Sequence, residues 1–212
     1  RLSELELFTT QQNQLTGSIP EGLSNCTKLQ ELNLGSNNFI GNIPSSLFSS
    51  PVGAFITLDM SNNKLSGSIP YGLGNMAQLL TLDLSNNNLS GSVPSDIVEC
   101  HALTSINLSA NSLAGAIPSS LGTSLRSLVA LNLSHNLING DIPSDLGNLT
   151  LLQELDLSSN GLEGEIPSSL ADIEFLVFLN ISFNDLEGSI PDGGVFDHVK
   201  AASFLGNPQL CG

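Results

Sequence analysis

Basic residues are scarce in this sequence: its 212 residues include five lysines and arginines against 20 aspartates and glutamates, for a formal net charge of −15. Nucleic-acid binding needs a basic surface that displaces the counterions of the phosphates. The basic residues are scattered along the chain, at Arg1, Lys28, Lys64, Arg126 and Lys200. We therefore expect no nucleic acid among the partners.

Long apolar runs are missing too. No run reaches the length of about 18 apolar residues that crosses a bilayer, so we expect no membrane contact within this chain. The first residues lack the pattern of a signal peptide, and Arg1 falls inside a repeating unit. We therefore expect the chain to be part of a longer protein.

Charged side chains and cysteines are few as well. Charged residues make up 12% of the sequence, so asparagine, serine and glycine carry the surface. The three cysteines have no zinc-ligand spacing, and the serines have no frame of histidine and aspartate around them. The sequence predicts no metal site, no cofactor and no catalytic residue.

What the sequence has in abundance is one repeating unit, clearest over residues 152–167, which read LQELDLSSNGLEGEIP. An asparagine marks each unit, at Asn13, Asn37, Asn63, Asn87, Asn111, Asn136, Asn160 and Asn184. A glycine stands four residues after every marker and a proline seven residues after it. A period of about 24 residues predicts a solenoid, because one unit cannot bury its apolar residues without stacked neighbours.

The chemistry of the unit predicts its conformation. Leu155 and Leu157 alternate with polar residues, which is the period of a half-buried strand. Asn160 can donate and accept hydrogen bonds where the chain bends. Gly164 permits a backbone torsion that other residues resist, and Pro167 removes a donor. We predict one parallel strand per coil and a short 3₁₀ or irregular turn on the outer, convex side.

The form L-x-x-L-x-L-x-x-N-x-L-x-G-x-I-P resembles the plant-type leucine-rich repeat of receptor-like kinase and receptor-like protein ectodomains. The resemblance implies a right-handed superhelical solenoid of the α/β repeat type. It also implies a non-catalytic domain on the extracellular face of the plasma membrane, reached through the secretory pathway. Such domains bind a peptide or protein ligand and a co-receptor.

The resemblance leaves three kinds of whole protein open. One is a receptor-like kinase, of which this chain would be the C-terminal part of the ectodomain. The second is a receptor-like protein that lacks a kinase. The third is a secreted inhibitor of cell-wall-degrading enzymes, of the polygalacturonase-inhibitor type, built on the same repeat.

We assign residues 1–191 to an array of about eight repeats and residues 192–212 to a C-terminal cap. The first repeat is irregular, because Leu2, Leu5 and Leu7 have strand spacing but stand too far from Asn13. Either residues 8–10 form an insertion, or Leu5, Phe8 and Thr10 fill the repeat positions. Two other repeats are longer, one by two residues within 49–52 and one by a single residue at Thr123 and Ser124, and we place both expansions on the convex side.

The C-terminal stretch after Pro191 departs from the repeat. We expect five apolar residues to cover the last coil, namely Val195, Phe196, Phe204, Leu205 and Leu210. The segment SFLGNPQLCG, residues 203–212, resembles the C-terminal cap of plant receptor-like kinases. That resemblance implies a disulfide from Cys211 to a residue beyond this chain. Cys26 and Cys100 share one repeat position, and we expect them to be small buried apolar residues.

The outward positions of the predicted strands form the candidate binding surface. Most carry Asp or Asn and Ser in regular columns, which we interpret as structural. Paired carboxylates such as Asp59 and Asp83 have no pocket around them, which speaks against catalysis. The departures from the columns, together with Asp156, are the candidate partner-binding residues: His135, Glu154, Asp156, Phe178 and Phe183. The alternative for the two phenylalanines is that the cap folds over them.

Residues 141–197 hold twelve acidic residues and no lysine or arginine. Such a segment attracts basic partners or serves only as a solvated face. Six N-x-S/T motifs agree with secretion and are candidate glycosylation sites, at Asn25, Asn88, Asn107, Asn132, Asn148 and Asn180. We expect Asn25 and Asn148 to be the most accessible, because both fall on the convex turn.

Overall fold

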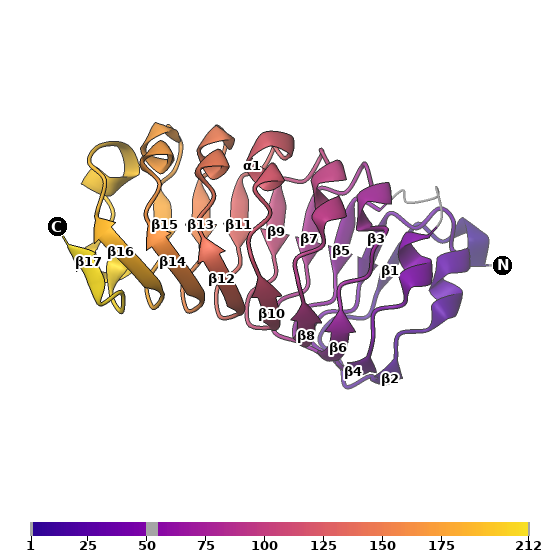
Figure 1. The fold of residues 1–212 in the computed structure, drawn as a ribbon. Helices are drawn as coiled ribbons and strands as arrows, with labels where there is room; N and C mark the ends of the chain where they lie inside the picture. Colours follow the sequence, from indigo (N-terminus) through magenta and orange to yellow (C-terminus); the bar gives the residue numbers. More distant parts are fainter. Residues whose placement is uncertain (1, 50–54, 212) are drawn as a thin grey trace.

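The structure is a computed structural model that describes residues 2–49 and 55–211. Its coils stack side by side along a curved rod, with the two termini at opposite ends (Figure 1). Each coil contributes to two parallel sheets, which run the length of the rod. The predicted repeat solenoid with parallel strands is therefore confirmed.

The first sheet has eight strands in the order of the chain, and we call it the eight-stranded sheet. It consists of β1 (Leu7–Thr9), β3 (Glu31–Asn33), β5 (Thr57–Asp59), β7 (Thr81–Asp83), β9 (Ser105–Asn107), β11 (Ala130–Asn132), β13 (Glu154–Asp156) and β15 (Phe178–Asn180). From β3 to β15 the middle residue is buried and its two neighbours reach the surface, as Leu155 shows, whereas Phe8 of β1 is half-buried. This is the strand that the leucine alternation predicts.

A second strand per coil forms a nine-stranded sheet that the repeat analysis did not predict. It consists of β2 (Thr16–Ser18), β4 (Asn38–Gly41), β6 (Lys64–Ser68), β8 (Asn88–Gly91), β10 (Ser112–Gly115), β12 (Leu137–Asp141), β14 (Gly161–Glu165), β16 (Asp185–Ser189) and β17 (Gln209–Cys211). Gly164 has φ +73° and still pairs in register with Leu186. The glycine therefore bends the strand without ending it.

Helical turns connect the sheets on the remaining side (Figure 1). They are η1 (Leu2–Glu4), η2 (Glu21–Asn25), η3 (Ser45–Phe48), η4 (Leu73–Asn75), η5 (Ser95–Glu99), α1 (Ser120–Ser124), η6 (Ser144–Asn148), η7 (Ser168–Asp172), η8 (Gly194–Asp197) and η9 (Ala201–Phe204). The repeat that contains Thr123 and Ser124 is one residue longer than the regular repeats, and its turn, α1, is α-helical. The N–H of Leu125 donates to the C=O of Leu121. Residues 50–52 of the other expansion lie outside the described residues.

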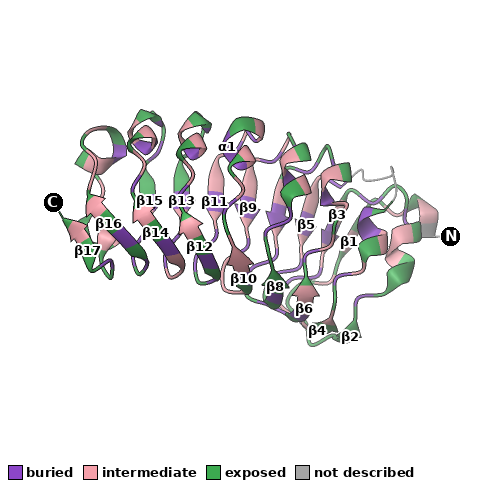
Figure 2. Cartoon of the chain, in the orientation of Figure 1, coloured by how far each residue is buried: buried purple, intermediate pink, exposed green. Residues whose placement is uncertain are grey.

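The core is one continuous strip of apolar side chains along the rod. Figure 2 shows buried residues along the whole length of the rod. Leu152, Leu155 and Leu157 have no exposed surface. Cys26 and Cys100 are buried in the same strip, as predicted. Full burial of each leucine contributes about 2 kcal/mol, so stability accumulates coil by coil.

The marker asparagines join each coil to the one before it. The side-chain nitrogen Nδ2 of Asn160 donates to the C=O of Leu133 in the preceding coil at 3.0 Å, and to Leu157 and Ser158 in its own coil. Its Oδ1 accepts the N–H of Ile138, also at 3.0 Å. The same pattern recurs at Asn37, Asn63, Asn87, Asn111, Asn136 and Asn184.

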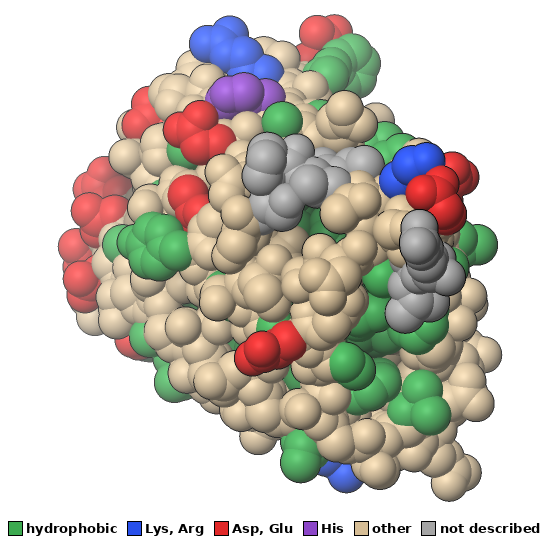
Figure 3. All heavy atoms as spheres, turned by 90° about the vertical axis from the view of Figure 1, so that its right-hand side faces the viewer, with side chains coloured by type: hydrophobic (Ala, Val, Ile, Leu, Met, Phe, Trp, Pro, Cys, Tyr) green, Lys and Arg blue, Asp and Glu red, His purple; other side chains and the backbone are tan. Residues whose placement is uncertain are grey.

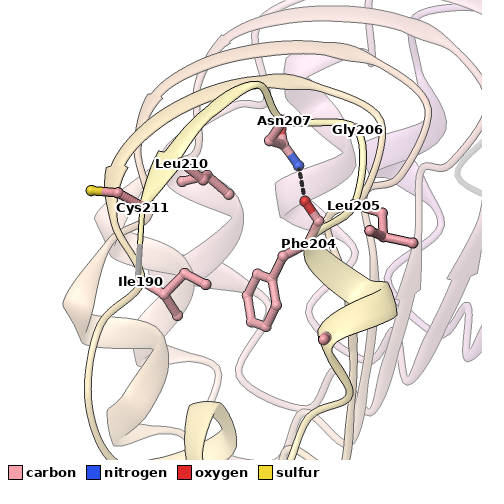
Figure 4. Close-up of a pocket in the computed structure, with 8 residues that line it drawn as sticks. Ile190, Phe204, Leu205, Gly206, Asn207, Leu210 and Cys211 are labelled. Atoms are coloured by element: carbon pink, nitrogen blue, oxygen red, sulfur yellow. Dashed lines mark hydrogen bonds between the residues drawn. The ribbon is translucent and has the colours of Figure 1, made fainter.

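This asparagine ladder continues into the C-terminal segment. Asn207 donates to the C=O of Phe204 (Figure 4) and of Ile181, and it accepts the N–H of Leu186. The repeat analysis missed this residue because Cys211, and not a glycine, stands four residues after it. The division at residue 191 stays a prediction, but residues 203–211 complete a shortened coil.

The apolar cover of the last coil is largely as expected. Val195 is buried, and Phe196, Phe204 and Leu210 pack against the core. The prediction for Leu205 was wrong, because its side chain is 58% exposed and lies away from Leu210 (Figure 4). Its backbone has the structural role, since its C=O accepts the N–H of Phe183.

The first coil resolves the two alternatives at the N-terminus. Phe8 pairs in register with Leu32 and packs against the core, whereas Leu7 is 53% exposed. Residues 8–10 are therefore not an insertion. Apolar side chains also show on the N-terminal end of the rod (Figure 3), where Phe8, Leu15 and Phe39 help to line a hollow of about 260 Å³.

The ladder predicts a stability cost for Asn111→Ala. The change removes the acceptor of the Leu89 N–H and the donor to the carbonyl groups of Leu84, Leu108 and Ser109. Leaving such groups unpaired costs about 1–3 kcal/mol. Thermal unfolding should show a lower Tm than for the control Asn88→Ala, whose side chain is exposed. Equal Tm values would show that the ladder is not structural.

Close stacking of the convex turns predicts a second cost. A Cβ added at Gly122 would lie 1.8 Å from the C=O oxygen of Asp145 in the next coil. Gly122→Ala should therefore lower the free energy of unfolding by about 1–3 kcal/mol through overpacking. Gly22 is the matched control, because a Cβ there meets nothing within 4 Å. Chemical denaturation of both variants measures the difference, and equal stabilities would contradict the stacking.

Candidate functional site

The regular Asp and Asn columns on the eight-stranded sheet are structural, as interpreted from the sequence. Oδ1 of Asp156 accepts the N–H of Ser158 at 3.0 Å and its hydroxyl at 2.6 Å. Oδ1 of Asn132 accepts the same two groups from Ser134. Aspartate and asparagine are interchangeable here because the turn uses only an acceptor oxygen. Of the candidate residues, Asp156 is thus already engaged within the fold.

His135 and Phe183 belong to a column with a left-handed backbone. Each stands directly before a marker asparagine, with φ of +54° and +56°. All its members are non-glycine: Gln12, Ser36, Asn62, Asn86, Ala110, His135, Ser159 and Phe183. The N–H of His135 donates to Ser158 of the next coil, so coil stacking holds this torsion. The side chains of this column reach the surface.

The structure brings two candidates together. Glu154 of β13 and Phe178 of β15 are paired in register, and both are exposed. Phe178 is 46% exposed and Phe183 is 60% exposed, so the cap does not fold over them. The cap nevertheless packs closely beside Phe183 at Gly206. A Cβ atom added to Gly206 would lie only 2.5 Å from the Phe183 ring. His135 lies two coils away from Phe183, with Ser159 between them in the column.

Seven of the twelve acidic residues in 141–197 lie on the two sheets, and the other five lie on or beside the helical turns. Glu154 and Asp156 lie on the eight-stranded sheet, whereas a second group lies in register on β12, β14 and β16 of the nine-stranded sheet: Asp141, Glu163, Glu165, Asp185 and Glu187. Neighbouring parallel strands lie about 4.8 Å apart, so these like charges repel. Among the described residues, ion pairs join only Lys28 to Glu4 and His101 to Glu99. The C-terminal carboxylates therefore present an uncompensated negative field.

The described residues also bear on catalysis and membrane insertion. Asp59 and Asp83 pair in register, but Oδ1 of each accepts the N–H of a serine two residues on. Burial raises the pKa of the Cys100 thiol to about 12, so it stays a thiol at neutral pH. Within residues 2–49 and 55–211, no three His, Cys, Asp or Glu side chains are grouped to hold a metal ion. The same residues form no helix long and apolar enough to span a bilayer.

The six N-x-S/T motifs fall on three surfaces. Asn25 ends η2 and Asn148 ends η6, and both are exposed on helical turns. Asn88 is exposed at the start of β8. The other three lie on the eight-stranded sheet, where their Oδ1 atoms accept from the following serines: Asn107, Asn132 and Asn180.

The sequence profile described as leucine rich repeat matches residues 27–89 and 101–162, more than half of the chain. The protein therefore belongs to the leucine-rich repeat family.

Among curated proteins, the rice Receptor kinase-like protein Xa21 (Oryza sativa subsp. japonica) is 44% identical over 74 residues, which are 34% of this chain and 7% of that protein. Receptor-like protein 32 of Arabidopsis thaliana is 42% identical over 84 residues, which are 37% of this chain and 9% of that protein. The chain thus spans less than a tenth of either relative.

Solved structures of plant receptor ectodomains resemble the chain over most of its length. The peptide hormone receptor RGFR1, solved with RGF2, is 39% identical with a TM-score of 0.86, over 89% of this chain and 30% of that one. The Arabidopsis receptor kinase HAESA, solved with the peptide hormone IDA and the co-receptor SERK1, is 31% identical with a TM-score of 0.77, over 99% and 38%. A plant ice-binding protein is 28% identical with a TM-score of 0.75, over 98% and 74%.

The exposed motifs predict glycans at Asn25 and Asn148. The protein should be expressed in a eukaryotic secretory host and its intact mass measured, with Asn25→Gln and Asn148→Gln as variants. Each substitution should remove the mass of one glycan, because both side chains project from exposed turns. Two unmodified sites in the parent protein would remove the support for placing these turns at the outer surface.

Proposed function

We propose that this chain is an extracellular recognition segment of a plant leucine-rich repeat receptor. It binds an extended peptide or protein ligand on the outer face of the eight-stranded sheet, cooperates with a co-receptor and does no catalysis itself. The observation that carries the proposal is the departure of this face from its own repeat, at Glu154 paired with Phe178 and at His135 and Phe183. The ligand complexes of the structural neighbours RGFR1 and HAESA support it.

The negative charge on the outer face of the eight-stranded sheet favours a basic or neutral ligand over an acidic one. The described lysines and arginines lie elsewhere: Lys28 pairs with Glu4, Lys64 is in β6, Arg126 follows α1, and Lys200 precedes η9. The face itself carries carboxylates at Glu31, Asp59, Asp83, Glu154 and Asp156. An acidic ligand would be repelled at long range, and a basic one attracted.

A receptor-like protein without a kinase fits the same face, and Receptor-like protein 32 supports that alternative as Xa21 supports the kinase. A secreted inhibitor of cell-wall-degrading enzymes would also use the repeat. Sequencing the gene beyond Gly212 separates these three, since a receptor-like kinase continues into a membrane span and a kinase, a receptor-like protein into a span without a kinase, and a secreted inhibitor into neither.

Two variants test the binding face. Phe183→Ala removes an exposed ring and should weaken binding by more than about 1 kcal/mol at any ionic strength. Glu154→Lys reverses a charge and should weaken binding of a basic peptide most at low salt, where screening is least. The measurement is fluorescence polarisation with three extended peptides of equal length that are lysine-rich, neutral and glutamate-rich.

Matched controls come from an earlier coil. Thr81→Lys changes the column of Glu154, and Asn86→Ala changes the column of Phe183. Both controls should bind the lysine-rich peptide like the parent. If Phe183→Ala and Glu154→Lys also bind like the parent at low and high salt, the binding surface lies elsewhere.

A further inference from the structure

An exposed apolar patch lies beside the eight-stranded sheet, outside the ligand face proposed above. It consists of Leu151, Phe175 and Val177, which are 46%, 50% and 80% exposed, and we call it the rim patch. These residues precede strands β13 and β15, between the helical turns and the sheet. Phe178 forms its border toward the ligand face.

Coil stacking makes the rim patch continuous. Leu151 and Phe175 each stand nine residues before a marker asparagine, in the same turn of neighbouring coils. The N–H groups of Val177 and Phe178 both donate to the C=O of Gln153 at 3.0 Å. The side chains of the two coils are therefore held one coil spacing apart, about 5 Å.

At one of its two repeat positions, the patch is specific to the last two coils. At the position of Leu151 and Phe175, earlier coils carry Lys28, Gln78, Ala102 and Ser127. The repeat therefore does not require large apolar residues there, and water contact makes them unfavourable for an isolated rod. Burial against a partner would remove that cost.

Carboxylates surround the patch. Glu154, Asp172 and Glu174 are exposed next to it, and residues 127–199 contain no lysine or arginine. The partner that complements this surface has apolar side chains flanked by basic ones.

We propose that the rim patch is a second docking surface, which binds a protein segment with an apolar stripe flanked by lysines or arginines. An amphipathic helix with a basic border has this chemistry. Burial of the apolar stripe provides most of the binding affinity. The nearby carboxylates orient the basic partner and raise its rate of association.

The test uses labelled amphipathic helical peptides as probes. One has a Leu/Phe stripe flanked by lysines, the second has the same stripe flanked by glutamates, and the third has the lysines with serines in the stripe. The parent protein should bind the first peptide and neither of the others. Phe175→Ser/Val177→Ser should weaken binding of the first at least about tenfold, as expected for loss of central anchors.

Two controls separate this surface from other parts of the rod. Leu80→Ser is matched to Val177, since both stand seven residues before a marker and Leu80 is 40% exposed. Phe183→Ala alters the proposed ligand face. Both variants should bind the lysine-flanked peptide like the parent, so the two proposals fail independently.

Three outcomes would overturn the proposal. One is unchanged binding by Phe175→Ser/Val177→Ser, and another is equal binding of the glutamate-flanked peptide. The third is a concentration-dependent dimer of the parent in sedimentation that this double variant abolishes, because a second copy would then be the occupant.

Discussion

Hydrogen bonding between neighbouring coils is the constraint on which this structure depends. Each coil is too small to bury its own leucines, so stability comes from contacts with the coils on either side. The marker asparagines make this possible by satisfying buried backbone groups at every bend, as Asn160 does for Ile138 and Leu133. Asn207 extends the same chemistry into the C-terminal segment, although Cys211 stands where the repeat has its glycine.

Regular stacking also decides where side chains can be variable. Positions are restricted where the side chain holds the turn, as at Asp156, or where the neighbouring coil lies too close for a side chain, as at Gly122. Positions that only reach the surface are free to differ. The left-handed column illustrates both rules, because its backbone is held by the next coil while its side chains range from serine to phenylalanine. Recognition residues can therefore be placed on a rod of fixed geometry.

The C-terminal coils combine these variable positions with a negative field. Phe178 and Phe183 supply exposed aromatic surface on one face, and Phe175 and Val177 supply exposed apolar surface on the neighbouring rim. Carboxylates without basic partners among the described residues surround both. Apolar contacts in such a field favour partners that are both apolar and basic, since electrostatic attraction guides the encounter and burial stabilises the complex.

The sequence by itself determined the coil, because the spacing of Leu155, Leu157, Asn160 and Gly164 reports local backbone geometry that recurs in every repeat. Only the tertiary structure decided what depends on contacts between coils. The second strand of each coil, the role of Asn207 and the exposure of Leu205 arise from pairing across about two dozen residues, which no local pattern encodes. The candidate residues divide in the same way: their departure from the repeat was readable from the sequence, whereas the exposure of Phe178 and Phe183 beside the cap was decided by the tertiary structure.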